Sequence, residues 1–272
     1  MPHCFRPGRA LRSQRGFSLV ELSIAMLIAL FLLGGLVTLV MGTRKTNATQ
    51  SSLSQLQDNQ RIAMTLIANV VQKAGYFPDP KTQMLSTFSA ETLAGVDMAS
   101  GQVLGGTYNA AAPGDSFAVR FFTPQNDTTN GNAVINCAGQ SNATGSTNVW
   151  YTNVFLVGTV NGTPWLQCQV RTSGAGTVLT VNLIPNVTQI SVLYGVSSNT
   201  AGDDYNIVQY LNAGQMTATS WLNVTAVKVT LTFQVPQYGS TGGQMTACGG
   251  SATCTQTFQR VIPIMSRAGV NT

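Results

Sequence analysis

An uncharged segment near the N-terminus limits what this 272-residue chain can fold into. Residues 17–41 read FSLVELSIAMLIALFLLGGLVTLVM, with Glu21 as the only charged residue. Residues 22–43 carry no charge, and at about 1.5 Å per residue a helix of that length spans a hydrocarbon core of roughly 30 Å. The first fifteen residues contain four arginines and no acid, so the positive-inside rule keeps them in the cytoplasm and places the body outside.

Two simpler interpretations of this segment are a cleaved secretory signal and a plain membrane anchor. A secretory signal has an apolar region of about 7–15 residues and a small-x-small cleavage site. The apolar segment here is longer, and the following residues, GTRKTNATQ, contain no convincing site. A plain anchor leaves Glu21 unexplained, because a carboxylate in an apolar span costs about 2.5–3.5 kcal/mol. We therefore expect Glu21 to have a partner.

Residues 15–22, RGFSLVEL, resemble the class III signal of type IV prepilins. The resemblance implies that a prepilin peptidase cuts between Gly16 and Phe17 and methylates the new amine of Phe17, so that the leader is lost and the helix stays. It also implies that Glu21 pairs with the N-terminal amine of a neighbouring subunit. Pairing two buried charges offsets much of the cost of burying each alone. A slipped helix would leave both charges unpaired, so such a pair fixes the register between subunits.

A second helical pattern follows the charged step at Arg44-Lys45. Apolar and small residues at alternating spacings of three and four predict an amphipathic helix whose stripe packs on the head. A coiled coil with another subunit is the less favoured alternative, because Gln60 and Ala63 weaken such a seam. Gly75 suits a C-terminal cap and two prolines follow it, so the helix is expected over about residues 18–74. The stripe consists of Leu53, Leu56, Gln60, Ala63, Ile67, Val70 and Ala74.

Beyond Tyr76 the pattern changes to short β-type segments separated by turn residues. Asn161-Gly162 predicts a hairpin with a type I′ turn. Alternating apolar residues from Val227 to Val235 indicate a strand with one face on the core. The predicted strands are residues 116–122, 149–160, 165–171, 178–184, 189–195, 224–235 and 257–265.

The predicted fold is therefore α+β, a long N-terminal helix packed on a β-rich, pilin-like head. Four segments are expected along the chain. They are a cytoplasmic leader (1–16), a transmembrane and polymerisation helix (17–43), an amphipathic half of the helix (44–75) and a globular head (76–272).

Cys4 lies in the leader, and the other four cysteines lie in the head. Removing the leader leaves an even number, which fits two disulfides formed in an oxidising compartment. Proximity favours Cys137 with Cys168 and Cys248 with Cys254, although the sequence alone leaves three connectivities open. A zinc site is the alternative, but Cys-x5-Cys is a poor match to zinc spacing and the head has no histidine. No metal is expected at these cysteines.

Charge and catalytic motifs favour a structural role. Of the 14 basic residues, four lie in the leader, so ten face nine acidic residues in the rest, and no nucleic-acid partner is expected. The only histidine, His3, leaves with the leader, so no Ser-His or Cys-His pair remains. The sequence contains neither HExxH nor a P-loop. Asp203-Asp204 suits a solvated turn better than a calcium site. We expect no enzymatic activity and no cofactor.

Further segments resemble the PilW family of minor pilins: Ala74-Gly75-Tyr76, IPNVTQISVLYGV (184–196), SWLNVTAVKVTLTFQV (220–235) and FQRVIPIMSR (258–267). The resemblance implies a subunit that helps to start a type IV pilus and lies near its tip. Its implied partners are the major pilin, other minor pilins, the inner-membrane assembly platform and, as a further candidate, a tip adhesin. Its implied location is the bacterial inner membrane, with a periplasmic head, and the pilus surface after assembly.

Two alternative functions stay open. A large minor pseudopilin of type II secretion would share the leader, the helix and a β-rich head. A tip adhesin or DNA-uptake subunit would need a ligand surface on the head, for which the candidates are Trp150, Tyr151 and Trp165.

Overall fold

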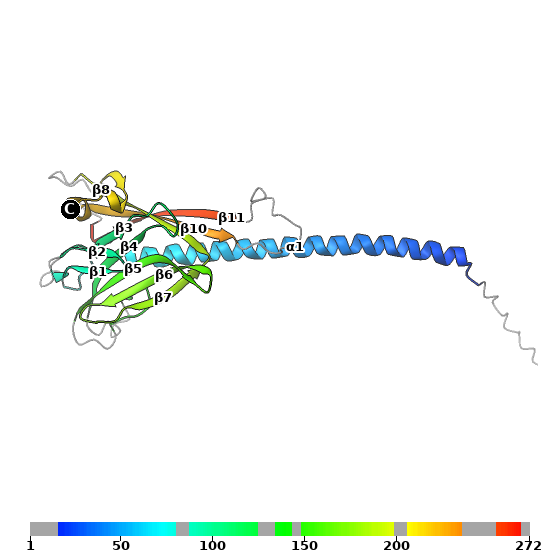
Figure 1. Ribbon diagram of the computed structural model, residues 1–272, viewed down its shortest axis with the longest axis horizontal. Helices are drawn as coiled ribbons and strands as arrows, with labels where there is room; N and C mark the ends of the chain where they lie inside the picture. The colour runs from blue at the N-terminus through cyan, green and yellow to red at the C-terminus, as the bar shows by residue number, and fades with distance from the viewer. Residues whose placement is uncertain are drawn as a thin grey trace, which may run out of the picture. The chain divides into compact units, whose positions relative to one another are not determined.

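The computed structural model describes residues 16–79, 87–124, 134–142, 148–198, 206–235 and 254–267. It consists of a long helix, α1 (Leu19–Val71), and a head of antiparallel strands (Figure 1). The chain forms two compact units, residues 1–50 and residues 51–272, so that α1 contributes to both. The predicted fold class, a long N-terminal helix with a β-rich head, is confirmed.

Helix α1 begins after Ser18, whose carbonyl oxygen accepts hydrogen bonds from the backbone N–H groups of Glu21 (3.0 Å) and Leu22 (3.2 Å). It ends three residues before the predicted position. Lys73 and Ala74 donate to the carbonyls three residues earlier, so the last turn tightens and leaves the α-helical pattern. Gly75 follows with a φ of +70°, the left-handed conformation predicted for a C-terminal cap.

A five-stranded sheet forms one layer of the head, in the order β3-β4-β5-β6-β7. Adjacent strands are antiparallel, and the predicted hairpin joins β5 to β6. Asn161 and Gly162 both have positive φ, as a type I′ turn requires. The strands are β3 (Leu104–Thr107), β4 (Ser116–Thr123), β5 (Val149–Val160), β6 (Thr163–Thr172) and β7 (Leu179–Pro185).

A four-stranded sheet forms the second layer, in the order β11-β10-β8-β9. A short hairpin, β1 (Glu91–Leu93) and β2 (Val96–Met98), and a short helix, α2 (Ala218–Leu222), accompany the two sheets. The predicted strand at 257–265 runs instead from Cys254 to Pro263, and Met265–Arg267 forms a 3-10 turn. The strands of this sheet are β8 (Val187–Ser197), β9 (Ile207–Leu211), β10 (Val224–Val235) and β11 (Cys254–Pro263).

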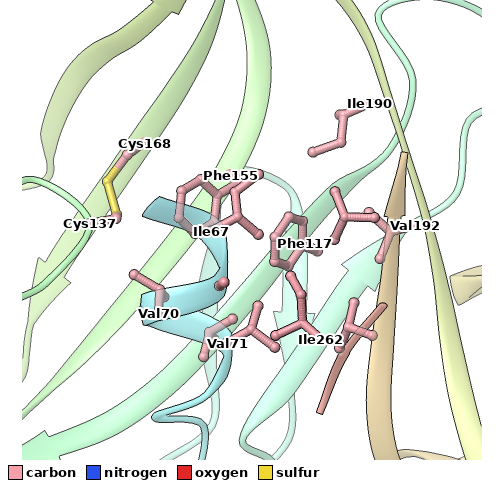
Figure 2. Packing of buried hydrophobic residues seen from close by; sticks show 14 of the residues in the cluster. Ile67, Val70, Val71, Phe117, Cys137, Phe155, Cys168, Ile190, Val192 and Ile262 are labelled. Atoms are coloured by element: carbon pink, nitrogen blue, oxygen red, sulfur yellow. A yellow bond between two sulfur atoms is a disulfide. The ribbon is translucent and has the colours of Figure 1, made fainter. Parts of the chain in front are cut away.

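The main core lies between the C-terminal part of α1 and both sheets (Figure 2). Ile67, Val70 and Val71 of α1 point toward side chains of the strands, which include Phe117, Phe155, Val192 and Ile262. The predicted packing stripe is confirmed from Leu56 onward, where its apolar members are buried and Gln60 is half-buried. The same core includes the apolar residues predicted for the inner face of β10.

The prediction that Leu53 belongs to the buried stripe was wrong, because this residue is 41% exposed. Ser52, not Leu53, lies on the buried face. A helix turns about 100° per residue, and position 52 continues the series 56, 63, 67 and 70 while position 53 turns away from the head. The buried stripe is also wider than predicted, because Met64, Ala68 and Val71 join it.

Buried polar contacts near Asp115, the residue before β4, connect the two sheets. The Asp115 carboxylate accepts hydrogen bonds from the backbone N–H groups of Asn109 (2.8 Å) and Val192 (2.7 Å). The hydroxyl of Tyr194 donates to the carbonyl of Gly105 at 3.2 Å. Burial and the nearby Asp115 carboxylate raise the pKa of Tyr194, so this phenol stays a neutral donor. These bonds fix β8 of the second sheet against β3 and β4 of the first.

Candidate assembly site

The residues predicted to carry processing and assembly lie together at the start of α1. Gly16 and Phe17 precede the helix, and the Phe17 side chain is 83% exposed. Glu21 lies in the first turn, where a carboxylate interacts favourably with the positive end of the helix dipole. Within the described residues, no side chain forms an ion pair or a hydrogen bond with the Glu21 carboxylate. None of the described side chains therefore occupies this carboxylate.

The helix that follows Glu21 is apolar on all sides. One stretch of α1 is long and apolar enough to cross a membrane, and none of that stretch is buried within the chain. A helix that is hydrophobic all round needs lipid or other apolar surfaces around it. Within residues 17–43, the exposed large apolar side chains are Phe17, Leu19, Val20, Leu22, Ile24, Met26, Leu27, Ile28, Leu30, Phe31, Leu32, Leu33, Leu36, Val37, Leu39, Val40 and Met41.

Several hydroxyl groups in this part of α1 bond to the helix itself. Ser23 Oγ donates to the Val20 carbonyl (2.8 Å), Thr38 Oγ1 to Gly35 (2.8 Å) and Thr43 Oγ1 to Val40 (2.9 Å). Such bonds satisfy a polar side chain without an external partner, which makes it compatible with an apolar surrounding. The Glu21 carboxylate has no equivalent bond in the described chain, and in this it differs from these three side chains.

The Cys137–Cys168 disulfide is formed, as proximity predicted, with 6.1 Å between the two Cα atoms. It ties the segment 134–142 to β6. The same segment is held to the end of α1 by Lys73, whose ammonium donates to the Ile135 carbonyl at 3.1 Å. Burial lowers the pKa of Lys73, and its ammonium lies 5.7 Å from the centre of the Phe121 ring. The disulfide and Lys73 thus fix this segment beside the helix end.

The structure describes only one of the two cysteines of the second predicted disulfide. Cys254, at the start of β11, is disulfide-bonded. Cys248 lies outside the described residues, as do Cys4 and the predicted turn at Asp203-Asp204. The pairing of Cys248 with Cys254 therefore stays a prediction.

Replacing both Cys137 and Cys168 with serine should lower the free energy of unfolding by about 2–4 kcal/mol. The bond closes a loop with a sequence separation of 31 residues, and a loop of this size restricts the unfolded chain by an entropy in that range. Chemical denaturation of the full-length chain in detergent would measure the change. In the same titration, reduction of the unmodified chain should give at least as large a loss, because reduction also breaks the disulfide at Cys254. A midpoint unchanged in both would contradict the prediction.

A buried ionic cluster, not predicted from the sequence, lies on the opposite face of the five-stranded sheet. Arg120, Thr152 and Arg171 form one row across β4, β5 and β6. Glu91 of β1 contacts all three. Its carboxylate accepts from Thr152 Oγ1 (2.6 Å) and Arg171 Nη1 (2.8 Å) and lies 3.5 Å from Arg120 Nη2. The cluster therefore fastens the β1–β2 hairpin to the sheet.

Arg120 is the residue of this cluster whose charge would be most costly to leave unpaired, because its side chain is fully buried. Its Nη1 donates to the Ser89 carbonyl at 2.8 Å, while Nε and Nη2 have no hydrogen-bond partner in the part of the chain that the structure describes. Burial lowers the pKa of Arg120 and the Glu91 carboxylate opposes that effect. The signal in the sequence was one charge in the apolar segment SFAVRFFT. Its partner Glu91 was not predictable, because Glu91 lies on a three-residue strand.

The aromatic residues considered for ligand binding lie mostly in packed surroundings. Tyr151 is buried, and its ring meets Phe121 edge-on. Trp150 is half-buried and packs against Phe88 and Phe122. Trp165 is half-buried in β6. Within the described residues, no group of three His, Cys, Asp or Glu side chains is placed to hold a metal. The suggested ligand surface was wrong at Tyr151, whose ring is buried in the packing of the head. At the half-buried Trp150 and Trp165 it stays a prediction.

Comparison with known proteins gives matches at both ends of the chain. Residues 154–262 match the family described as Type IV Pilus-assembly protein W, and residues 11–37 match the prokaryotic N-terminal methylation motif. No curated protein gives a significant match. A solved type IV-like pilin from Thermus thermophilus is similar at 13% identity and a TM-score of 0.44, covering 79% of this chain and 97% of that one. Both resemblances drawn from the residues are confirmed by the two family matches.

Proposed function

We propose that this chain, which is a type IV pilin-like protein with a methylation motif and a PilW-type head, is a minor pilin that helps to start pilus assembly and lies near the pilus tip. The observation that carries the proposal is the start of α1. There, an exposed apolar helix follows directly on Gly16-Phe17, and its one carboxylate, Glu21, has no partner among the described residues. The PilW match over the head favours a minor pilin within that class.

The proposed processing step is cleavage between Gly16 and Phe17 by a prepilin peptidase, followed by methylation of the Phe17 amine. Both residues lie outside the helix and are exposed, which suits access by a peptidase. Cleavage would create a positive charge at Phe17, one helical turn from Glu21. The Glu21 carboxylate of this subunit would then pair with the amine of a neighbour, because two charges in an apolar filament core are each costly when unpaired.

Before assembly, residues 17–43 would hold the subunit in the inner membrane with the leader inside and the head in the periplasm. During assembly the same helix would leave the lipid and enter the filament core. The head would then cover the outside and contact the major pilin and other minor pilins. The PilW-type head supports this arrangement.

A deletion strain, scored in parallel for sheared surface pili and for secreted exoproteins, tests the proposal. We expect pili to be lost and secretion to stay normal, with pili restored by the wild-type gene. Lost secretion with intact pili would instead assign the chain to a type II secretion pseudopilus. If neither changed, pilus initiation would be rejected, and binding of a ligand or DNA at the tip would become the hypothesis to test.

A further inference from the structure

Among the described residues, strand β11 is an end strand of the four-stranded sheet, with its outer edge unpaired. It is the end strand in the order β11-β10-β8-β9. Its ten residues, Cys254–Pro263, pair with β10 without a register shift, so the strand stays regular over its whole length. In an antiparallel sheet, the outer side of an end strand presents N–H and C=O groups that can pair with a further strand.

The hydrogen bond beyond the end of β11 shows which peptide groups face outward. Ile264 N donates to the Thr225 carbonyl at 2.9 Å, in register with the β10–β11 ladder. Bonded and non-bonded pairs alternate along an antiparallel ladder, so the peptide groups of odd-numbered β11 residues face away from β10. They belong to Thr255, Thr257, Gln259, Val261 and Pro263.

Two details agree with this assignment. Side chains approach closely in non-bonded pairs, and the hydroxyl oxygens of Thr257 and Thr232 are 3.3 Å apart. Proline is tolerated on an edge strand where its missing N–H would face solvent, and Pro263 occupies such a position. Within the described residues, no segment other than β10 pairs with β11.

The other sheet edges are short or irregular, as natural edges usually are. β3 has four residues and β9 has five. β9 also has a register shift against β8, and β7 has one against β6 and ends at Pro185. β11 lacks these protections among the described edges. Its one charged residue is Arg260, and its only proline lies at the end.

We propose that an extended segment of a different protein chain pairs with the outer edge of β11 in the assembled state and adds a fifth strand to this sheet. Main-chain bonds to the outward peptide groups would hold it, as in other cases of strand addition. The exposed Val261 side chain, at 48%, and the half-buried Phe258 offer apolar contact. Arg260 is exposed and has no ion pair within the described residues, so the segment should carry a carboxylate facing it.

The charge of the edge argues against a second copy of this chain as the partner. A second β11 would bring another Arg260 and no carboxylate, because the strand contains no acidic residue. The inference concerns strand pairing by the head and does not depend on pilus initiation. Amide exchange measures strand pairing, whereas the number of pili in the deletion strain measures pilus initiation. Either proposal can therefore be rejected while the other stands.

Amide hydrogen exchange at single-residue resolution is the first test. The full-length chain is compared in detergent and in complexes purified from membranes of cells that make the filament. We expect the outward amides of Thr255, Thr257, Gln259 and Val261 to exchange at least about 100-fold more slowly in the complexes. The amides of Gln256, Phe258 and Arg260, which face β10, should be protected in both. Equal exchange of the outward amides in both samples would overturn the proposal.

A pair of variants at Thr257 separates the main chain from the side chain. Thr257→Pro and Thr257→Val both remove the hydroxyl, but only proline removes the outward N–H. Relative to Thr257→Val, we expect Thr257→Pro to lower recovery of the partner in the purified complexes by about tenfold, with the partner identified by mass spectrometry. Equal recovery would overturn the proposal. If Thr257→Pro does not fold, the exchange measurement on the unmodified chain decides.

Sedimentation of the purified full-length chain completes the test. A monomer in detergent, with the outward amides unprotected, is the expected result. If the purified chain is instead a dimer in which those four amides are protected, the edge pairs with a second copy. That outcome would overturn the assignment to a different protein.

Discussion

Replacing Glu21 with valine should leave cleavage after Gly16 unchanged but reduce recruitment of the chain into assemblies with other pilins by at least about tenfold. The structure gives the physical reason. Glu21 is the only charge in residues 17–43, and no described side chain pairs with it. In the proposed assembly its loss leaves the neighbour's amine unpaired in an apolar surrounding. A penalty of only about 1.4 kcal/mol already corresponds to a tenfold change in association.

Co-purification of the variant with its partner pilins measures recruitment, and mass spectrometry of the mature N-terminus measures processing. The matched control is Thr38→Val in the same helix. The Thr38 hydroxyl is already bonded to the Gly35 carbonyl, so its removal should leave recruitment unchanged. Wild-type recovery of the Glu21 variant would contradict the proposed role, whereas an uncleaved leader would show that Glu21 acts earlier, in processing.

The long elements were predictable from the sequence because each carries its own pattern. Residues 224–235 alternate between apolar and polar side chains, and the structure contains β10 over the same residues. The short elements carry too few residues for a pattern. β1 and β2 have three residues each, and β3 is the segment LGGT, whose glycines disfavour a strand. These strands exist because the larger sheet provides their packing partners.

The candidate assembly site could be proposed from the sequence because it is contiguous. Gly16, Phe17 and Glu21 lie within six residues, and a local motif specifies them. The Cys137–Cys168 pairing was also predictable, since proximity along the chain favoured it. The position of β11 at the end of the described sheet was not predictable. A sequence pattern indicates a strand, but its place in the sheet order depends on pairing between β10, β8 and β9.

The ionic cluster was not predictable either, because it joins four strands through contacts between residues that are distant in sequence. Glu91→Ala should lower the free energy of unfolding by about 3–5 kcal/mol, the range for removing one partner of a buried ion pair. Arg171 is 31% exposed and can regain water, but Arg120 is fully buried and would keep an uncompensated charge. Chemical denaturation of the full-length chain in detergent measures the loss.

Two further variants separate charge burial from the loss of a contact. Asp97→Ala, in the same hairpin, removes an exposed carboxylate bonded to the Thr92 hydroxyl, so it should cost less than about 1 kcal/mol. The double variant Glu91→Leu with Arg120→Met removes both buried charges. It should recover a large part of the stability lost in Glu91→Ala, because an apolar pair of similar volume avoids the desolvation of two ions. A double variant as unstable as Glu91→Ala would show that the hairpin depends on the carbonyl contacts of Arg120 rather than on charge balance.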